Sequence, residues 1–285
     1  MLEVKNLSVF VQQETDEIQV VQDISFQVPK GKVVGIVGES GSGKSMICTT
    51  ILQLFNEGRR VEGEIFYKGE LLFQKNKKEM RNLRGKEIAL IMQNPMSMFN
   101  PMLSIGDHFV ETLQAHIKIS KIDAKIKALE QLSRYQLPGD HVLNKYPHEL
   151  SGGMLQRIMI AIAVSHYPSL IIADEPTTAL DTMTQLRILD ELQAYQQDSG
   201  ASILIVSHDL GVIAKIADEL IVMRRGIMVE YGPASLVLDN PRHPYTQALL
   251  AAKEKNRSLD ELVDQYDEPI VEPLVEWKPG YWVRQ

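Results

Sequence analysis

The chain has 285 residues, of which 44% are hydrophobic and 24% charged, as in an ordinary soluble globular protein. Its formal net charge of −7 argues against a general binder of nucleic-acid backbones, because such binding requires clustered cations. The single cysteine, Cys48, excludes an internal disulfide framework and a multi-cysteine metal site, and it favours a reducing compartment. The longest strictly apolar run, residues 158–164, is too short to span a membrane, and the first residues lack a signal-peptide pattern.

The main part of the chain is predicted to form an α/β fold. Short apolar runs that are typical of buried parallel strands lie at residues 33–37, 88–92, 170–173, 203–206 and 220–223. Stretches with helical spacing separate several of them, which predicts helices on both faces of a sheet. The first 30 residues and residues 63–69 alternate apolar and polar positions, so we expect antiparallel strands there. Residues 103–148 carry helical spacing and predict a helical insert.

The strongest local motif is a glycine-rich phosphate loop at residues 38–45, which fits G-x-x-x-x-G-K-[ST] between a predicted strand and a predicted helix. Its glycines allow successive backbone N–H groups to face inward around an anion, and the helix start adds the positive end of its dipole. Lys44 is expected to reach the β- and γ-phosphates of a nucleotide, and the Ser45 hydroxyl to ligate Mg²⁺. The candidate nucleotide-binding residues are Gly38, Ser40, Gly41, Ser42, Gly43, Lys44 and Ser45.

Two carboxylates end the predicted strand at residues 170–173. Asp174 lies at the strand tip, where it is expected to hold Mg²⁺ directly or through water. Glu175, its neighbour, is expected to polarise an attacking water beside a bound triphosphate. Taken alone, the pair would be two solvated acids at a strand end, and the phosphate loop is what favours the catalytic interpretation.

A second anion-binding helix end is predicted at Ser151, Gly152 and Gly153. Ser151 is placed to cap a helix running from Gly152 to about His166, and the two glycines leave its first N–H groups unobstructed. The run Leu-Ser-Gly-Gly-Met-Leu-Gln-Arg resembles the signature motif of the ATP-binding cassette (ABC) family. Together with the phosphate loop, this resemblance implies that the fold class is an α/β P-loop NTPase of the ABC type, with an antiparallel β subdomain, a helical subdomain and a short C-terminal extension.

The resemblance implies roles for three further residues. Gln93 resembles the glutamine that lies near Mg²⁺ and forms a hinge to the helical subdomain, and Asp181 ends an Ala-Leu-Asp run that resembles the D-loop. His208 resembles the switch histidine that contacts the γ-phosphate. The catalytic candidates are thus Glu175, His208 and Gln93, and the metal ligands are Ser45, Gln93 and Asp174. One feature departs from the family, because residues 15–18 lack the usual aromatic partner for adenine.

Further motifs resemble the ATPases of oligopeptide, dipeptide and nickel permeases. They include Asn-Pro-Met-Ser-Met-Phe-Asn-Pro-Met at residues 94–102 and Asn-Pro-Arg-His-Pro-Tyr-Thr-Gln-Ala at residues 240–248. The resemblance implies a cassette over residues 1–235, with its helical subdomain at about 95–166, followed by a C-terminal extension over residues 236–285. Methionines at positions 92, 96, 98 and 102 form either an adaptable socket for a membrane-domain helix or ordinary core filling. The basic residues between 75 and 86 are interpreted as a solvated surface.

The leading hypothesis is an ATP-hydrolysing subunit, with Mg²⁺, of a bacterial ABC importer for peptides, nickel or metal–chelator complexes. The resemblance implies a head-to-tail dimer with a second ABC ATPase subunit, homologous or identical, in which the segment at residues 151–153 and Asp181 serve the partner's nucleotide. It also implies two transmembrane permease subunits, an indirect extracytoplasmic substrate-binding protein, no nucleic acid, and a peripheral location on the cytoplasmic face of the cell membrane. The alternatives are a non-transport ABC ATPase acting on nucleic acid or ribosomes, and a P-loop kinase.

The net charge is concentrated in the C-terminal extension. Residues 259–285 contain seven acidic and two basic residues, a net charge of −5, which leaves −2 for residues 1–258. The same segment ends in an aromatic run with both tryptophans, which predicts that it docks on its own cassette or on a neighbouring subunit.

Overall fold

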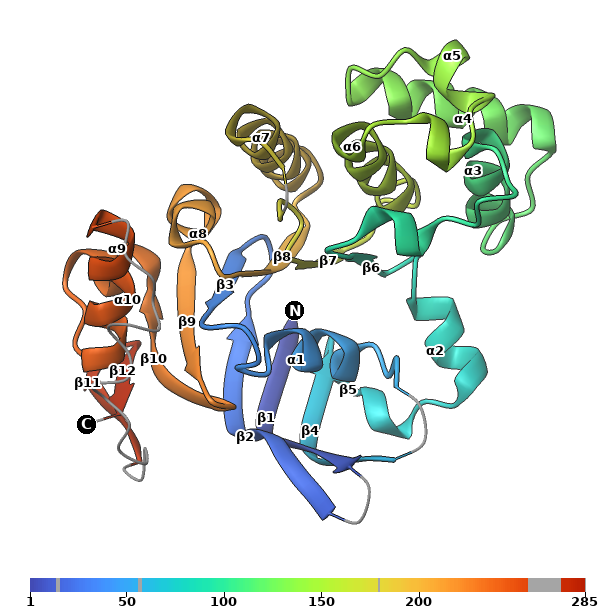
Figure 1. Cartoon of the computed structure of the whole chain (residues 1–285). Coiled ribbons are helices and arrows are strands. Elements are labelled where there is room, and N and C mark those ends of the chain that lie inside the picture. The colour runs from blue at the N-terminus through green and yellow to red at the C-terminus, as the bar shows by residue number, and fades with distance from the viewer. Residues whose placement is uncertain (14–15, 56–57, 179, 256–272, 285) are drawn as a thin grey trace. The chain divides into compact units, whose positions relative to one another are not determined.

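The computed structural model describes residues 1–13, 16–55, 58–178, 180–255 and 273–284 (Figure 1). The chain divides into two compact units. Residues 1–76 and 202–285 form the first unit, and residues 77–201 form the second. The first unit contains the phosphate loop and the C-terminal extension, and the second contains the helical insert and the paired carboxylates.

A mixed sheet with a parallel centre runs through the first unit. Strand β3 (Val33–Val37) is buried along its whole length and pairs in parallel with β8 (Ser202–Ser207) on one side and β9 (Glu219–Arg224) on the other. These three strands are confirmed where the apolar runs predicted them. β10 (Ile227–Pro233) pairs antiparallel with β9 and continues the sheet toward the C-terminal strands.

The N-terminal strands form a second sheet in the same unit, as predicted. Its strand order is β2-β1-β4-β5, and the two ladders of β1 and the pairing of β4 with β5 are antiparallel. The bounds are β1 (Leu2–Gln13), β2 (Asp16–Val28), β4 (Arg59–Tyr67) and β5 (Glu70–Leu71). The helices of the unit are α1 (Lys44–Ile51), the short 3-10 helix η1 (Leu72–Gln74), α8 (Leu210–Ile216), α9 (Ala234–Asp239) and α10 (Pro244–Lys255).

The C-terminal extension docks on its own cassette, which confirms one of the two expectations for this segment. The hairpin of β11 (Leu274–Lys278) and β12 (Tyr281–Arg284) joins the sheet through β12, whose Val283 pairs with Glu230 of β10. Most of the acidic residues counted in the extension lie outside the described residues.

A buried carboxylate ties this extension together. Glu230 is 0% exposed and accepts hydrogen bonds from the backbone N–H groups of Arg242 (2.8 Å) and His243 (3.2 Å), and from the Tyr281 hydroxyl. Burial, followed by the hydrogen bond to Glu230, raises the pKa of Tyr281, so this hydroxyl keeps its proton. Because a buried carboxylate is stable only when its oxygens are hydrogen-bonded, these donors hold the start of α10 against β10 and β12.

The second unit combines two parallel strands with a group of helices. β6 (Ile88–Ile91) pairs in parallel with β7 (Leu170–Asp174). The helices are α2 (Lys77–Leu83), the 3-10 helix η2 (Pro95–Met98), α3 (Ile105–Gln114), α4 (Lys121–Arg134), α5 (Gly139–Leu143), the 3-10 helix η3 (Pro147–Glu149), α6 (Gly152–Ala163) and α7 (Thr182–Ser199). In Figure 1, α3, α4 and α5 lie together in green, and they confirm the helical insert.

Side-chain caps define where these helices begin. Ser104, Ser120, Ser151 and Asp181 each accept a hydrogen bond from the backbone N–H three residues ahead, which satisfies a donor that the helix leaves open. Helix α6 begins as predicted but ends at Ala163, three residues before the predicted end. The chain tightens there into turns in which Ser165 and Tyr167 donate to carbonyls only three residues back.

An ion pair is buried beneath α6. The Nε atom of Arg157 lies 3.0 Å from Oε1 of Glu191 on α7, and both side chains are largely buried. Burial raises the pKa of Glu191, while the charge of Arg157 opposes this shift. The Glu191 carboxylate therefore depends on the guanidinium for its charged form.

We expect Arg157→Ala to lower the free energy of unfolding by about 3–5 kcal/mol, because it leaves the Glu191 carboxylate buried without its partner. Urea denaturation followed by circular dichroism measures the change. Lys145→Ala is the control, since its pair with Glu149 lies at the surface, and we expect a loss of under about 1 kcal/mol. Equal losses in the two variants would contradict the role given to burial.

Candidate functional site

The phosphate loop connects β3 to α1 in the first unit, as the sequence predicts. Gly43 precedes α1 with φ of 94°, and Gly41 has φ of 80°, backbone conformations that favour glycine. A Cβ atom at Gly38 would lie 2.1 Å from the carbonyl oxygen of Met223, which belongs to β9. The loop therefore needs glycine at position 38 because the neighbouring strand leaves no room for a side chain.

Lys44 lies in the first turn of α1 and is only 4% exposed. Its Nζ atom donates hydrogen bonds to the carbonyl oxygens of Gly38 (2.8 Å) and Glu39 (2.7 Å). The ammonium group is thus held within the loop by the loop's own backbone. Of the other candidates, Ser42 is buried, whereas Ser40, Gly41 and Ser45 are exposed.

His208 emerges beside the phosphate loop. β3 and β8 pair in parallel with Val37 opposite Ser207, so the next residues along the two strands, Gly38 and His208, leave the sheet at the same edge. His208 is exposed, and it is followed by Asp209, whose side chain caps α8. The structure therefore brings two predicted parts of the site together in the first unit.

The second unit brings the predicted carboxylates next to Gln93. Ile91 pairs with Ala173 in the parallel ladder of β6 and β7, so that Gln93 and Glu175 leave these strands at the same level. The Nε2 atom of Gln93 donates to Oε2 of Glu175 over 3.3 Å. Asp174 is the last residue of β7 and is half-buried.

Glu175 has an unusual backbone and a further partner that the sequence did not predict. Its φ of 48° lies in the left-handed region, which is costly for a residue with a side chain. The Thr178 hydroxyl donates to Glu175 Oε2 over 2.7 Å, and the Thr178 N–H donates to the Glu175 carbonyl over 3.3 Å. Together with Gln93, Thr178 fixes the orientation of this carboxylate.

The second predicted anion-binding helix end begins α6. Ser151 Oγ accepts the N–H of Met154 over 3.4 Å, and a Cβ atom added at Gly152 would meet no atom within 4 Å. A Cβ atom at Gly153 would lie 3.0 Å from the Cγ2 of Thr184 in the first turn of α7. Asp181 caps α7, and its hydrogen bonds from the Thr184 side chain and backbone lower its pKa. The structure thus places Asp181 next to this helix start, while Ala179 lies outside the described residues.

The donors named for Mg²⁺ are all oxygen-bearing groups. Ser45 supplies a hydroxyl in the first unit, while Asp174 and Gln93 supply a carboxylate and an amide in the second. Mg²⁺ prefers oxygen ligands and usually takes one or two from protein and the rest from phosphates and water. Among the described residues, no three His, Cys, Asp or Glu side chains form a group that could hold a metal by themselves. The residue types at these positions therefore suit Mg²⁺, an ion that commonly binds together with the phosphates of a nucleotide.

The region where the family has an adenine-stacking aromatic is partly outside the described residues, which omit positions 14 and 15. Ile18 is exposed in β2. Phe10 of β1 is covered by the Arg60 guanidinium, whose carbon lies 3.7 Å from the ring centroid, and Arg60 also pairs with Glu17 over 2.6 Å.

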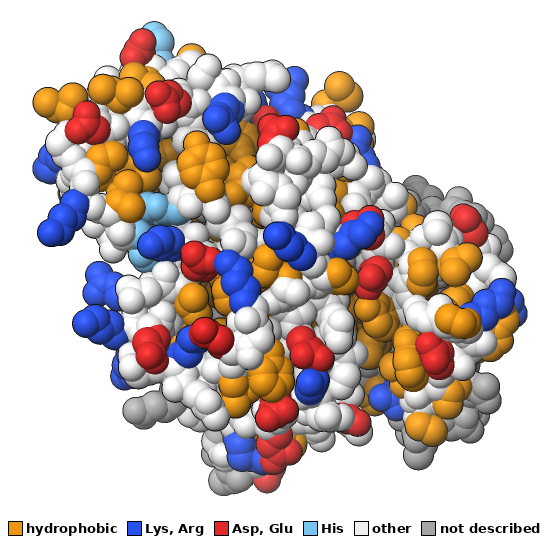
Figure 2. Space-filling view, turned by 180° about the vertical axis from the view of Figure 1, so that it is seen from behind, with side chains coloured by type: hydrophobic (Ala, Val, Ile, Leu, Met, Phe, Trp, Pro, Cys, Tyr) orange, Lys and Arg blue, Asp and Glu red, His pale blue; other side chains and the backbone are white. Residues whose placement is uncertain are grey.

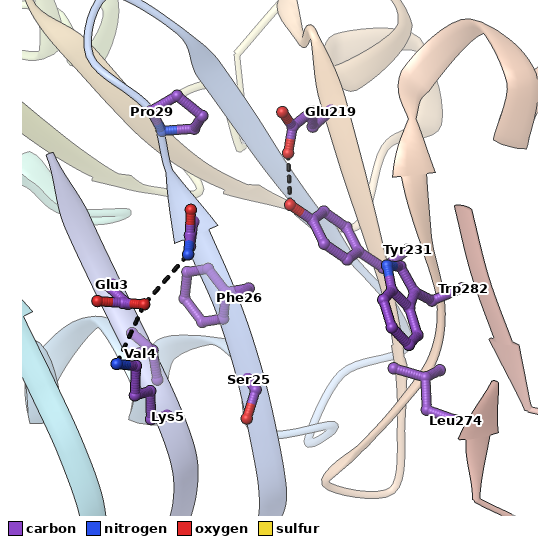
Figure 3. Close-up of a pocket in the computed structure, with 11 residues that line it drawn as sticks. Glu3, Val4, Lys5, Ser25, Phe26, Pro29, Glu219, Tyr231, Leu274 and Trp282 are labelled. Atoms are coloured by element: carbon purple, nitrogen blue, oxygen red, sulfur yellow. Dashed lines mark hydrogen bonds and ion pairs between the residues drawn. The ribbon is translucent and has the colours of Figure 1, made fainter. Parts of the chain in front are cut away.

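A pocket of about 470 Å³ lies within the first unit, between the antiparallel sheet and the C-terminal strands (Figure 3). Trp282, Tyr231 and Phe26 line it, and the Tyr231 hydroxyl donates to Glu219 over 2.5 Å. The predicted nucleotide-binding residues are not among those that line it. The pocket marks the place where the extension packs beside β1 and β2.

Exposed methionines gather after β6. Met96 is 45% exposed, Met98 43% and Met102 79%, so ordinary core filling is the wrong interpretation for these three side chains. Most of the basic stretch is solvated, as interpreted from the sequence: Lys77, Lys78 and Arg81 are exposed, whereas the Lys75 side chain pairs with Glu70 and is only 18% exposed. On the face seen in Figure 2, Lys and Arg side chains are interspersed with Asp and Glu side chains.

Among the described residues, none of the helices has the length and apolar character that a membrane span requires.

Two protein families match the sequence. The ABC transporter family matches residues 21–178, and the C-terminal region of oligopeptide/dipeptide transporters matches residues 229–272. The first match contains the phosphate loop, Gln93, the 151–153 segment and both carboxylates. The second begins in β10 and includes α9 and α10.

Curated relatives cover most of the chain. The oligopeptide transport ATP-binding protein OppD of Bacillus subtilis is 44% identical over 255 residues, which cover 88% of this chain and 71% of that protein. The glutathione import ATP-binding protein GsiA of Pectobacterium atrosepticum is 38% identical over 264 residues, which cover 88% of this chain and 42% of that protein.

Solved ATP-binding cassettes have the same fold. A dimeric cassette in a post-hydrolysis state with ADP and Pi has a TM-score of 0.75 at 26% identity, and the match covers 82% of this chain and 99% of that one. CbiO1 of Clostridium perfringens, part of an ABC transporter complex, has a TM-score of 0.71 at 22% identity, with 94% and 98% covered. The ABC-type P-loop fold predicted from the sequence is thereby confirmed.

We expect Gly38→Ala to weaken ATP binding about 100-fold or more, because the new Cβ meets a strand carbonyl 2.1 Å away and the loop must leave its position. Gly41→Ala is the matched control, since a Cβ there meets no atom within 4 Å and only the backbone is strained, by about 1–2 kcal/mol. Calorimetric titration with ATP measures both. If the Gly38→Ala and Gly41→Ala variants bound ATP with equal affinity, the contact with β9 would not determine the conformation of the loop.

Proposed function

This chain belongs to the ABC transporter family and hydrolyses ATP to ADP and phosphate, and on that premise we propose that it energises a bacterial peptide importer. The observation that carries the proposal is the match of its C-terminal region to that of oligopeptide/dipeptide transporters. The names of the two relatives, which refer to oligopeptides and glutathione, support a peptide cargo. Nickel and metal–chelator complexes are the alternative cargo for this subfamily.

The proposed nucleotide site uses the residues predicted from the sequence. The phosphate loop holds the phosphates through its N–H groups, Lys44 pairs with the β- and γ-phosphates, and His208 contacts the γ-phosphate. Glu175 orients the attacking water, and its hydrogen bonds to Thr178 and Gln93 support this role because they aim the carboxylate.

We assign Ser45, Asp174 and Gln93 as the protein ligands of Mg²⁺, directly or through water. The ion, when bound with ATP, neutralises charge on the phosphates. The oxygen donors at these positions support the assignment, and the remaining ligands are expected from phosphate and water.

The proposed working form is a head-to-tail pair of cassettes. Ser151, Gly152, Gly153 and Asp181 then serve the nucleotide held by the partner's phosphate loop. The capped, unobstructed start of α6 supports this assignment, since such a helix end presents N–H groups and a positive dipole to an anion. A dimeric form of the similar solved cassette supports the pairing. Charge supplied by a partner can accelerate phosphoryl transfer by about 10³–10⁵-fold, which would make hydrolysis depend on closure.

The proposed complex contains a second cassette, homologous or identical, and two transmembrane permease subunits on whose cytoplasmic side the chain sits. A substrate-binding protein acts indirectly from the other side of the membrane. The exposed methionines after β6 support a contact with a permease helix, because methionine side chains adapt their packing to a partner. We propose a cassette over residues 1–235, with its helical subdomain at about 95–166, and an extension over residues 236–285.

Glu175→Gln should lower the rate of ATP hydrolysis about 100-fold or more while ATP still binds, because an amide of the same shape cannot act on the attacking water. The variant should accumulate as an ATP-bound dimer, measured by phosphate release and by size-exclusion chromatography with ATP. Glu130→Gln, which removes an exposed carboxylate on α4, is the control and should hydrolyse ATP normally. Unchanged turnover in Glu175→Gln would remove this residue from its assigned role.

Transport in liposomes tests the importer itself. The chain is purified with the subunits that copurify from the membrane, reconstituted with ATP on the cassette side, and supplied with labelled oligopeptide and the substrate-binding protein on the other. We expect ATP-dependent peptide uptake that Lys44→Ala abolishes. Uptake of Ni²⁺ without peptide uptake would contradict the cargo, and a complex without permease chains would contradict the importer.

A further inference from the structure

The His-Pro-Tyr segment of the extension reaches the phosphate loop. Tyr245, in the first turn of α10, is 0% exposed, and its hydroxyl oxygen accepts the backbone N–H of Glu39 over 3.0 Å. The two residues are 206 positions apart in the sequence and belong to the same compact unit. A side chain of the extension therefore holds the second residue of the phosphate loop.

This hydrogen bond acts on the peptide unit that also holds Lys44. The N–H of Glu39 and the C=O of Gly38 belong to one planar peptide, so fixing one end fixes the other. The Gly38 carbonyl oxygen accepts a hydrogen bond from Lys44 Nζ over 2.8 Å. One rigid peptide thus has the Tyr245 hydroxyl at its N–H end and the Lys44 ammonium at its carbonyl end.

Main-chain atoms of other segments also hold or confine the loop. The Gly226 N–H donates to the Ser42 carbonyl over 3.2 Å, and a Cβ atom at Gly43 would lie 2.7 Å from the carbonyl oxygen of Val20. Both supports act near the α1 end of the loop. At the β3 end, Met223 limits the space around Gly38, and the Tyr245 hydroxyl sets the direction of the next N–H.

The position of the Tyr245 ring is itself fixed. The Arg224 guanidinium lies over the ring, 5.3 Å from its centroid, and the Tyr245 N–H donates to Nδ1 of His243 over 3.1 Å. Burial raises the pKa of Tyr245 to about 12, so the hydroxyl stays neutral near the loop. The oxygen is consequently presented to the loop by a side chain with little freedom to move.

We propose that Tyr245 is a positioning residue for nucleotide binding: through the Gly38–Glu39 peptide it sets where Lys44 meets the nucleotide phosphates. The inference rests on the proposed role of Lys44 in the site. It makes the C-terminal extension, which marks the subfamily, a structural part of the phosphate loop.

Tyr245→Phe tests the proposal, because it removes one oxygen atom and keeps the buried ring. We expect the dissociation constant for ATP of the purified full chain to rise about 3–10-fold, the effect of one hydrogen bond. In the reconstituted complex, KM for ATP should rise by a similar factor while kcat changes less than about twofold. Amide hydrogen exchange should quicken in peptides that contain Glu39, since the N–H loses its acceptor.

Tyr281→Phe is the matched control. It removes another buried hydroxyl from the same extension, the one that donates to Glu230, without touching the loop. If Tyr245 merely stabilised the extension, both variants would lower the melting temperature. ATP binding would then be unchanged in both variants, or weakened equally in both. The proposal requires weaker ATP binding and faster exchange at Glu39 in Tyr245→Phe alone. Unchanged affinity and exchange in that variant would overturn it.

Lys44→Ala separates this inference from the site on which it rests. If Lys44→Ala binds ATP as well as the unmodified chain, the assigned role of Lys44 is wrong and the inference falls with it. If Lys44→Ala loses ATP binding while Tyr245→Phe retains full affinity, the site stands and only the role of Tyr245 is wrong.

Discussion

The register of the parallel strands is the constraint that positions the candidate site residues within each unit. In the first unit, β3 and β8 pair with Val37 opposite Ser207, and in the second, β6 and β7 pair with Ile91 opposite Ala173. Two parallel strands in such register end at the same edge of the sheet, so the residues that follow them lie side by side in each pair. A slip of one residue would turn every side chain of a strand to the opposite face and would separate Gln93 from Glu175.

Local patterns predicted much of this arrangement. The apolar run at residues 33–37 has the same bounds as β3, because every residue of this strand is buried and the apolar run therefore ends where the strand ends. Ser151 caps α6 as predicted, since a helix start depends on a few adjacent residues and their N–H groups. The order of motifs along the chain then gave the ABC fold, which the family and structure comparisons confirm.

Contacts between segments that are far apart in the sequence could not be predicted from local sequence patterns. The Tyr245–Glu39 hydrogen bond joins residues 206 positions apart, and Arg60 covers Phe10 across paired strands. The exposure of Met96 could not be predicted from its apolar character, because an exposed apolar side chain and a buried one look alike in the sequence. The left-handed backbone of Glu175 was also missed, since it reflects the turn after β7 rather than any preference of glutamate.

The same physics explains why an extension of the cassette takes part in the phosphate loop. The Glu230 carboxylate is 0% exposed and must be hydrogen-bonded, so it holds the N–H groups of Arg242 and His243 at the start of α10. Burial, together with the nearby charges of Arg224 and Arg284, lowers the pKa of His243 to about 4, so its Nδ1 is free of a proton and accepts the N–H of Tyr245. Each hydrogen bond in this series fixes the donor or acceptor of the next. The series begins at Glu230 on β10 and ends at the Glu39 N–H, so the backbone donors at the start of α10 connect this buried carboxylate to the peptide that holds Lys44.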